Sequence, residues 1–113
     1  MRVTSSLWVG AFVRRCTGEG MFAAVIRRGA DEAGVIFIVL DKLDGSLDLY
    51  GPAPQSSFDE AHPSDRLFQK IATAVDQPAV DARLAKEGRF DPDFWVVAVE
   101  DRAGRTLFDV VGG

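Results

Sequence analysis

The sequence contains one cysteine, Cys16, and one histidine, His62. A lone cysteine cannot form an internal disulfide, which fits a reducing compartment. Structural zinc sites draw four ligands mainly from cysteine and histidine, and this chain cannot supply such a set. A serine triad would have to use His62, yet the sequence has no Gly-x-Ser-x-Gly elbow. These two scarcities argue against zinc chemistry and against nucleophilic catalysis.

The sequence also lacks the glycine-rich signatures of phosphate-binding loops, Gly-x-x-x-x-Gly-Lys and Gly-x-Gly-x-x-Gly. Its longest early apolar run, residues 7–13, is too short to span a bilayer. Arg14 and Arg15 follow that run where a signal peptide requires small residues. We therefore expect a cytoplasmic protein that is not associated with a membrane.

The remaining composition is that of an ordinary globular protein, with 47% hydrophobic and 27% charged residues. A length of 113 residues suits one domain. No repeat or linker divides the chain, so residues 1–113 are expected to form a single domain. The net charge of −4 argues against broad, non-specific binding to nucleic acid.

The first part of the chain predicts a helix followed by two strands. A helix over residues 6–17 gathers its apolar side chains on one face, and a strand over residues 7–13 is the alternative. The continuous apolar run 21–26 predicts a strand with both faces covered. The run 35–40, rich in β-branched residues, predicts a second strand, joined to the first by a hairpin loop over residues 29–34.

Asp44-Gly45 is a strong turn signal, and it leads into a third predicted strand over residues 46–50. In that strand Leu47 and Leu49 face one way while Asp48 and Tyr50 face the other, which is the alternation of a half-exposed strand. The segment 51–63 carries three prolines and predicts a long loop.

The later segments add a helix and further strands. Residues 66–75 fit both a helical and a strand pattern, and the sequence leaves this choice open. Pro78 and Gly88 suit the start and the end of a short helix over residues 79–87. An apolar strand is expected over residues 94–99 and a terminal hairpin strand over 106–111. The prediction is α+β: a mainly antiparallel sheet of about five or six strands with two or three helices packed on it.

Candidate ligand-binding residues gather in and before the segment 59–65. His62, Asp65 and Asp59 supply imidazole and carboxylate donors, and Tyr50 precedes the loop. Pro63 prevents a helix from aligning these groups, and no second histidine completes a metal site. No metal, cofactor or catalytic residue is therefore predicted, and these four residues are held as ligand candidates.

Two further sets of residues are candidates for binding. The first is a basic patch of Arg14, Arg15, Arg27 and Arg28, which suits phosphate or an acidic protein surface. The second is the pair of tryptophans, Trp8 and Trp95, which are expected in the core or at a dimer interface. Cys16 lies on the apolar face of the predicted helix, where cysteine acts as a small hydrophobe.

Three segments together resemble a known family. They are residues 7–11, Leu-Trp-Val-Gly-Ala, followed by Arg14-Arg15-Cys16; residues 43–45 and 49–54, Leu-Asp-Gly and Leu-Tyr-Gly-Pro-Ala-Pro; and residues 89–97, Arg-Phe-Asp-Pro-Asp-Phe-Trp-Val-Val. The pattern resembles a family of small alphaproteobacterial proteins known as a domain of unknown function. The resemblance spans nearly the whole chain and implies a bacterial, stand-alone domain. It implies no activity, cofactor or catalytic residue.

The leading functional hypothesis is a non-enzymatic binding or regulatory module that acts through contacts with an unknown protein partner, with a homodimer as one form. The absence of a convergent polar site favours it. The alternatives are a small-ligand-binding protein or enzyme with a site near the loop 51–65, and a nucleic-acid binder that uses the arginine patch. Nucleic acid is disfavoured because stacking aromatics do not accompany the arginines.

Overall fold

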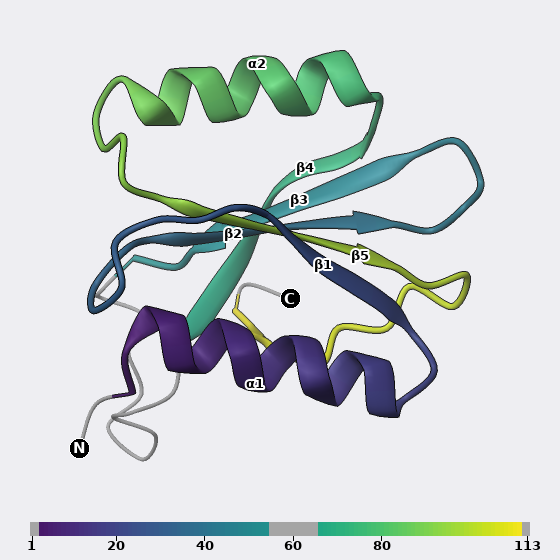
Figure 1. The fold of residues 1–113 in the computed structure, drawn as a ribbon. Helices are drawn as coiled ribbons and strands as arrows, with labels where there is room; N and C mark the ends of the chain where they lie inside the picture. Colours follow the sequence, from purple (N-terminus) through teal and green to yellow (C-terminus); the bar gives the residue numbers. More distant parts are fainter. Residues whose placement is uncertain (1–2, 55–65, 112–113) are drawn as a thin grey trace.

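The computed structural model describes residues 3–54 and 66–111. Within these ranges the chain forms two helices and six strands (Figure 1). In chain order these are α1 (Ser5–Gly18), β1 (Phe22–Arg27), β2 (Ile36–Asp41), β3 (Leu47–Pro52), β4 (Leu67–Val75), α2 (Gln77–Gly88), β5 (Trp95–Glu100) and β6 (Asp109–Val110).

Helix α1 confirms the helical prediction for the first segment over the strand alternative. The Thr4 hydroxyl caps it by accepting a hydrogen bond from the Leu7 amide at 3.2 Å. Val9, Phe12 and Cys16 recur at helical spacing and are buried against the sheet. The helix ends before Gly20, whose φ of +82° turns the chain into β1.

The sheet has the strand order β1-β5-β2-β3-β4-β6. The β1–β5, β2–β3 and β3–β4 pairs are antiparallel, whereas the β5–β2 and β4–β6 pairs are parallel. The sheet is therefore mixed and mostly antiparallel. The predicted hairpin between β2 and β3 is present, with Asp41 opposite Leu47. The α+β prediction with a mainly antiparallel sheet is therefore confirmed.

The predicted hairpin over residues 29–34 is wrong, because β5 lies between β1 and β2 and pairs with both. The prediction that β1 is covered on both faces is also wrong. β1 is an edge strand, and most of its side chains are exposed or half-buried. The six apolar residues at 94–99, five of them buried, make β5 the better central strand, because they can be buried on both faces.

The open choice at residues 66–75 is settled as strand β4. Its pairing with β3 shifts register on both sides of Leu49. These irregularities break the alternation of the side chains: the adjacent residues Ile71 and Ala72 both pack on the α2 side of the sheet, whereas Phe68 packs on the α1 side. The mixed pattern in the sequence therefore comes from bulges within one strand.

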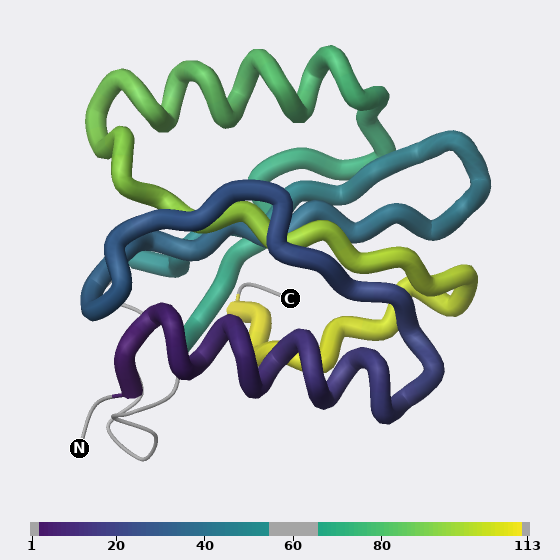
Figure 2. The backbone as a smooth tube through the Cα atoms, viewed as in Figure 1, coloured from purple at the N-terminus to yellow at the C-terminus, as the bar shows by residue number. Residues whose placement is uncertain are grey.

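The C-terminal segment does not form the predicted hairpin strand with β5. β6 instead pairs in parallel with β4, at the far edge of the sheet. The Phe108 ring lies 5.8, 5.0 and 5.2 Å from the rings of Phe12, Tyr50 and Phe68. Burying this aromatic ring between α1 and the sheet holds the segment there, where the backbone trace shows it below the strands (Figure 2).

The two helices cover opposite faces of the sheet (Figure 1). Helix α2 begins at the cap Asp76, whose carboxylate accepts a hydrogen bond from the Ala79 amide at 3.0 Å. It buries Val80 against the second hydrophobic cluster. Neither helix in the described ranges is long and apolar enough to cross a membrane.

Candidate functional site

Of the four ligand candidates, Tyr50 is the one that the structure describes. His62, Asp65 and Asp59 lie outside the described residues. Tyr50 is buried on the α1 side of the sheet, so the prediction of a half-exposed β3 is wrong at this position. The Lys70 ammonium lies 5.7 Å from the centroid of the Tyr50 ring. Tyr50 is thus part of the core beside a polar cluster.

The four arginines of the predicted basic patch do not form one surface. A short turn joins α1 to β1, so Arg14 and Arg15, near the helix end, lie close to the start of β1. The Ser5 amide donates to the Glu32 carbonyl at 3.0 Å, which places the helix start beside the loop after β1. Arg27 is the last residue of β1 and Arg28 follows it, so both lie at the opposite end of the α1–β1 pair.

Arg27 and Arg28 also engage different groups. The Arg27 guanidinium lies 4.0 Å from the Phe94 ring centroid and donates to the Pro92 carbonyl. The Arg28 guanidinium lies 4.9 Å from the Trp95 ring centroid. Because Phe94 and Trp95 belong to the clusters on opposite sides of the sheet, the two arginines diverge. The geometry gives no support to a single nucleic-acid-binding face.

The two tryptophans have different environments. Trp95 is buried, and its indole Nε1 donates to the Ala30 carbonyl at 2.8 Å. It is a core residue and is not accessible to a partner. Trp8 is partly buried and stacks on Phe12 with 5.0 Å between ring centroids. Cys16 is also buried, and this burial raises the pKa of its thiol despite the nearby Arg15.

The outer surface of β1 carries several exposed apolar side chains. The side chains of Phe22 and Ile26 are 59% and 60% exposed, and Val25 is exposed as well. Among the described strands β1 pairs with β5 alone, so its other edge carries backbone groups with no strand beside them. An exposed strand edge with apolar side chains is suited to pairing with another chain.

A groove of about 440 Å³ opens beside this edge, between β1 and α2. Helix α2 packs over β3 and β4, and its Val80 and Leu84 also belong to the cluster of Phe94 and Val96, which are buried. Ile26 and Arg27 form one wall and α2 the other, while β5 and the residue before it form the floor. Its lining includes Ile26, Arg27, Asp81, Leu84, Phe94 and Val96.

Charged residues of both signs flank β1. Glu19 precedes the strand and its carboxylate lies 3.9 Å from the Arg105 guanidinium. Arg27 and Arg28 stand at the other end, where the Arg28 guanidinium lies 3.8 Å from the Asp31 carboxylate. Neither end of the edge is therefore purely acidic or purely basic.

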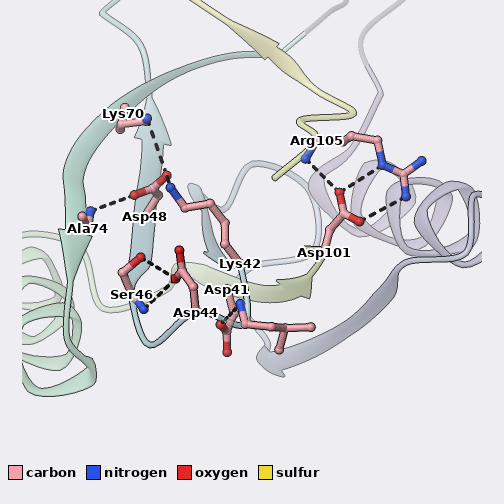
Figure 3. Close-up of polar contacts among 10 residues, drawn as sticks. Asp41, Lys42, Asp44, Ser46, Asp48, Lys70, Ala74, Asp101 and Arg105 are labelled. Carbon is pink, nitrogen blue, oxygen red and sulfur yellow. Dashed lines mark hydrogen bonds and ion pairs between the residues drawn. The ribbon is translucent and has the colours of Figure 1, made fainter. Parts of the chain in front are cut away.

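A buried carboxylate marks the other end of the sheet (Figure 3). Asp48 Oδ2 lies 3.3 Å from the Lys42 ammonium and 3.5 Å from that of Lys70. Its Oδ1 accepts a hydrogen bond from the Ala74 amide at 2.8 Å. Burial alone would raise the pKa of Asp48, but the Ala74 amide and the two lysines outweigh it and hold the pKa below its ordinary value.

The neighbouring carboxylates are engaged in local turns. Asp44 accepts hydrogen bonds from the amide and hydroxyl of Ser46 at 3.0 and 2.7 Å, and the bond from the hydroxyl lowers the pKa of Asp44. Asp101 accepts from the Arg105 guanidinium, which lowers the pKa of Asp101 in the same way (Figure 3). Within residues 3–54 and 66–111 no three acidic, histidine or cysteine side chains converge as metal ligands.

A second, polar hollow of about 330 Å³ lies between α1 and the segment that precedes β6. Trp8, Arg15, Arg66 and Thr106 contribute to its lining. Arg15 Nη1 donates to the Leu107 carbonyl at 3.5 Å, and Arg66 Nη2 donates to the Val3 carbonyl at 2.9 Å. Two guanidiniums at one hollow suit an anionic group, and the carboxylate of Asp109, which also lines it, opposes one.

The β1 edge and the Asp48 cluster were both missed by sequence reasoning. An apolar run such as residues 21–26 is typical of a buried strand, and nothing local distinguishes an edge strand from a central one. One signal was available: two short helices cannot cover every face of so many apolar strands. The cluster around Asp48 could not be predicted, because its members Lys70 and Ala74 are far from Asp48 in the sequence.

Two helices on opposite faces of a mixed, mostly antiparallel sheet define a small α+β domain. The chain belongs to the family described as protein of unknown function DUF1491, whose model matches residues 3–109. This confirms the family resemblance seen in the three sequence segments.

Two solved proteins illustrate the similarity. The solution structure of protein Atu0922 from A. tumefaciens is 40% identical, covers 100% of this chain and 98% of its own, and has a TM-score of 0.86. The crystal structure of a DUF1491 family protein from Caulobacter crescentus is 30% identical, with 99% and 100% coverage and a TM-score of 0.78. The comparison with curated proteins found no match.

Proposed function

We propose that this domain is a cytoplasmic protein-binding module that docks another protein chain along β1. The observation that carries the proposal is the exposed apolar edge of Phe22, Val25 and Ile26 beside the groove under α2. An added strand would satisfy the outer backbone groups of β1, and its side chains would bury the apolar ones. The groove supplies a pocket for specificity.

Phe22 and Ile26 expose more than half of their surfaces, and burying a large apolar side chain stabilises a complex by about 1.5–3 kcal/mol. Both side chains lie on one short strand, so a single docked segment covers them together. Clustering of this kind is what distinguishes an interaction surface from scattered surface apolar residues.

The test compares three versions of the intact domain as bait in host-cell lysate, with bound proteins quantified by mass spectrometry. The double variant Phe22→Lys/Ile26→Lys places charges on the β1 edge. Leu7→Lys is the matched control, because Leu7 is equally apolar and 65% exposed but lies on α1. We expect a protein that binds the wild type and Leu7→Lys and is lost from the double variant. Equal recovery on all three baits, or no bound protein, would contradict the proposal.

A second candidate function, binding of a small anionic ligand, is favoured by the hollow that Arg15 and Arg66 line. Titration with inorganic phosphate, followed by amide chemical shifts, tests it. We expect shifts at Arg15 and across residues 106–109, and their loss in Arg15→Gln. Arg14→Gln is the control, because Arg14 does not line the hollow. Shifts that persist unchanged in Arg15→Gln would exclude this site.

A further inference from the structure

The hollow between α1 and the segment before β6 carries charges of both signs. Its lining includes Arg15, which lies on α1, and Asp109, which is the first residue of β6. Both residues are exposed. Among the described residues neither side chain forms an ion pair, with the other or with any further charged group. The hollow therefore presents a cation and an anion that a small molecule can reach together.

The donors around Arg15 suit a carboxylate. Arg15 uses one N–H to donate to the Leu107 carbonyl at the long distance of 3.5 Å. A guanidinium has five N–H donors in a planar fork, so Arg15 retains a pair that matches the two oxygens of a carboxylate. Arg66 lines the same hollow, and its bond to the Val3 carbonyl at 2.9 Å orients its guanidinium there. The hydroxyl of Thr106 adds a neutral donor to this side of the hollow.

Asp109 distinguishes a plain anion from a zwitterion as the better ligand. A plain anion gains from the guanidiniums but is repelled by the Asp109 carboxylate. A plain cation meets the reverse conflict, because Arg15 and Arg66 repel it. A molecule that carries an ammonium group beside its carboxylate satisfies both sides, since the ammonium donates to Asp109 while the carboxylate accepts from Arg15.

The size and the walls of the hollow suit a small ligand. Its volume of about 330 Å³ lies at the lower end of the range of ligand-binding pockets. The Trp8 ring forms part of the wall, and it is held by the rings of Phe12 and Phe68 at 5.0 and 5.3 Å. The segment 106–109 forms another part and is anchored by the Phe108 ring, 5.8 Å from that of Phe12. Walls that are already packed in place lose little entropy when a ligand binds.

We propose that this hollow binds a small zwitterion of the α-amino-acid class, with its carboxylate on Arg15 and its ammonium on Asp109. This proposal rests on the second candidate function, because it names the class of ligand for the same hollow. Arg15 belongs to α1 and Asp109 to β6, so the bound molecule bridges the first helix and the last strand.

The test titrates the wild type with glycine, acetate and methylamine at about pH 7 and equal ionic strength, and follows amide chemical shifts. Glycine carries both charges at this pH, whereas acetate and methylamine carry one each. We expect glycine to shift the amides of Arg15 and residues 106–109 and to half-saturate at about a fivefold lower concentration than acetate. Methylamine should leave these amides unshifted, because the guanidiniums repel it.

Two variants separate the two charges. Arg15→Gln should abolish the response to glycine. Asp109→Asn should raise the half-saturating concentration of glycine about fivefold and should lower that of inorganic phosphate, because the opposing carboxylate is removed. Asp81→Asn is the matched control, since Asp81 is an exposed acid on α2, on the other face of the sheet, and both titrations should be unchanged in it. Unshifted amides outside the hollow verify that each variant is folded.

A wild type that binds glycine no more tightly than acetate overturns this proposal. So does an affinity for glycine that is the same in Asp109→Asn as in the wild type. Either result leaves the second candidate function standing if inorganic phosphate still shifts Arg15 and residues 106–109. If phosphate shifts none of these amides, both proposals for the hollow fail together.

Discussion

The carboxylate of Asp48 accepts a hydrogen bond from the backbone amide of Ala74 at 2.8 Å, across the β3–β4 pair. Leu47 pairs with Val75 and Leu49 with Ala72, so Asp48 faces two residues of β4, and Ala74 takes a φ of +52°. The bulge turns the Ala74 amide out of the strand ladder. Asp48 supplies the acceptor that this amide would otherwise lack.

Replacing Asp48 by Asn should lower the free energy of unfolding at pH 7 by about 1–3 kcal/mol, because Lys42 and Lys70 lose their charged partner while the amide oxygen can still accept from Ala74. Urea unfolding measures the change. The variant Asp44→Asn is the control, because Asp44 lies in the exposed β2–β3 turn and its loss should cost less. Equal losses would show that the buried ion pairs contribute nothing.

The contribution of Asp48 should also depend on pH. Its pKa in the folded protein lies below the value of about 3.9 of an unfolded aspartate, so between these values the folded state binds fewer protons. The stabilisation is therefore fully present above the unfolded pKa and is lost as the pH falls through the folded pKa. The stability difference between wild type and Asp48→Asn should shrink on acidification below about pH 4. A constant difference down to pH 2 would contradict the assignment.

Gly29 is expected to tolerate no side chain. A Cβ at this position would lie 2.5 Å from the Asp93 carbonyl oxygen and 2.7 Å from Cδ1 of Trp95. Gly29→Ala should therefore destabilise the protein by about 3 kcal/mol, since backbone and a buried ring must shift. Gly18→Ala is the matched control, because a Cβ there meets nothing within 4 Å, and it should change stability by less than about 0.5 kcal/mol. Thermal unfolding of both variants decides the point.

The Cys16 thiol should be inert in the folded protein. Burial raises its pKa and excludes reagents. With a disulfide reagent at pH 8, we expect labelling at least about a thousandfold slower than in urea, because it must await opening of the structure. Rapid labelling of the native protein would show that the helix α1 does not seal this side of the core.

Phe108 should anchor the C-terminal segment. Its ring contacts those of Phe12, Tyr50 and Phe68, so Phe108→Ala should cost about 2–4 kcal/mol. Phe90→Ala is the control, because Phe90 is 82% exposed and its loss should change stability by less than about 0.5 kcal/mol. Hydrogen exchange at the Val111 amide, which donates to the Phe68 carbonyl at 2.8 Å, should accelerate in Phe108→Ala alone. Similar effects of the two variants would refute this role.

The sequence correctly predicted the helices and the turn that are determined by residues close together in the chain. Thr4 and the spacing of Val9, Phe12 and Cys16 define α1, and Asp44-Gly45 defines the β2–β3 turn. Pro78 and Gly88 bracket α2. In each case the residues that determine the structure lie within a few positions of one another, so a pattern can show them.

The tertiary structure alone decided strand order, the exposure of β1 and the burial of Asp48. β5 lies between β1 and β2, where a hairpin was expected, because the strand that buries most apolar surface on both faces takes the position inside the sheet. Asp48 becomes a buried charge because Ala74 and Lys70 reach it from a strand more than twenty residues away. Apart from residues 66–75, the sequence by itself determined which segments are helix, turn and apolar strand. Which of those strands is left at an edge depends on long-range packing, and the proposed binding surface follows from that packing.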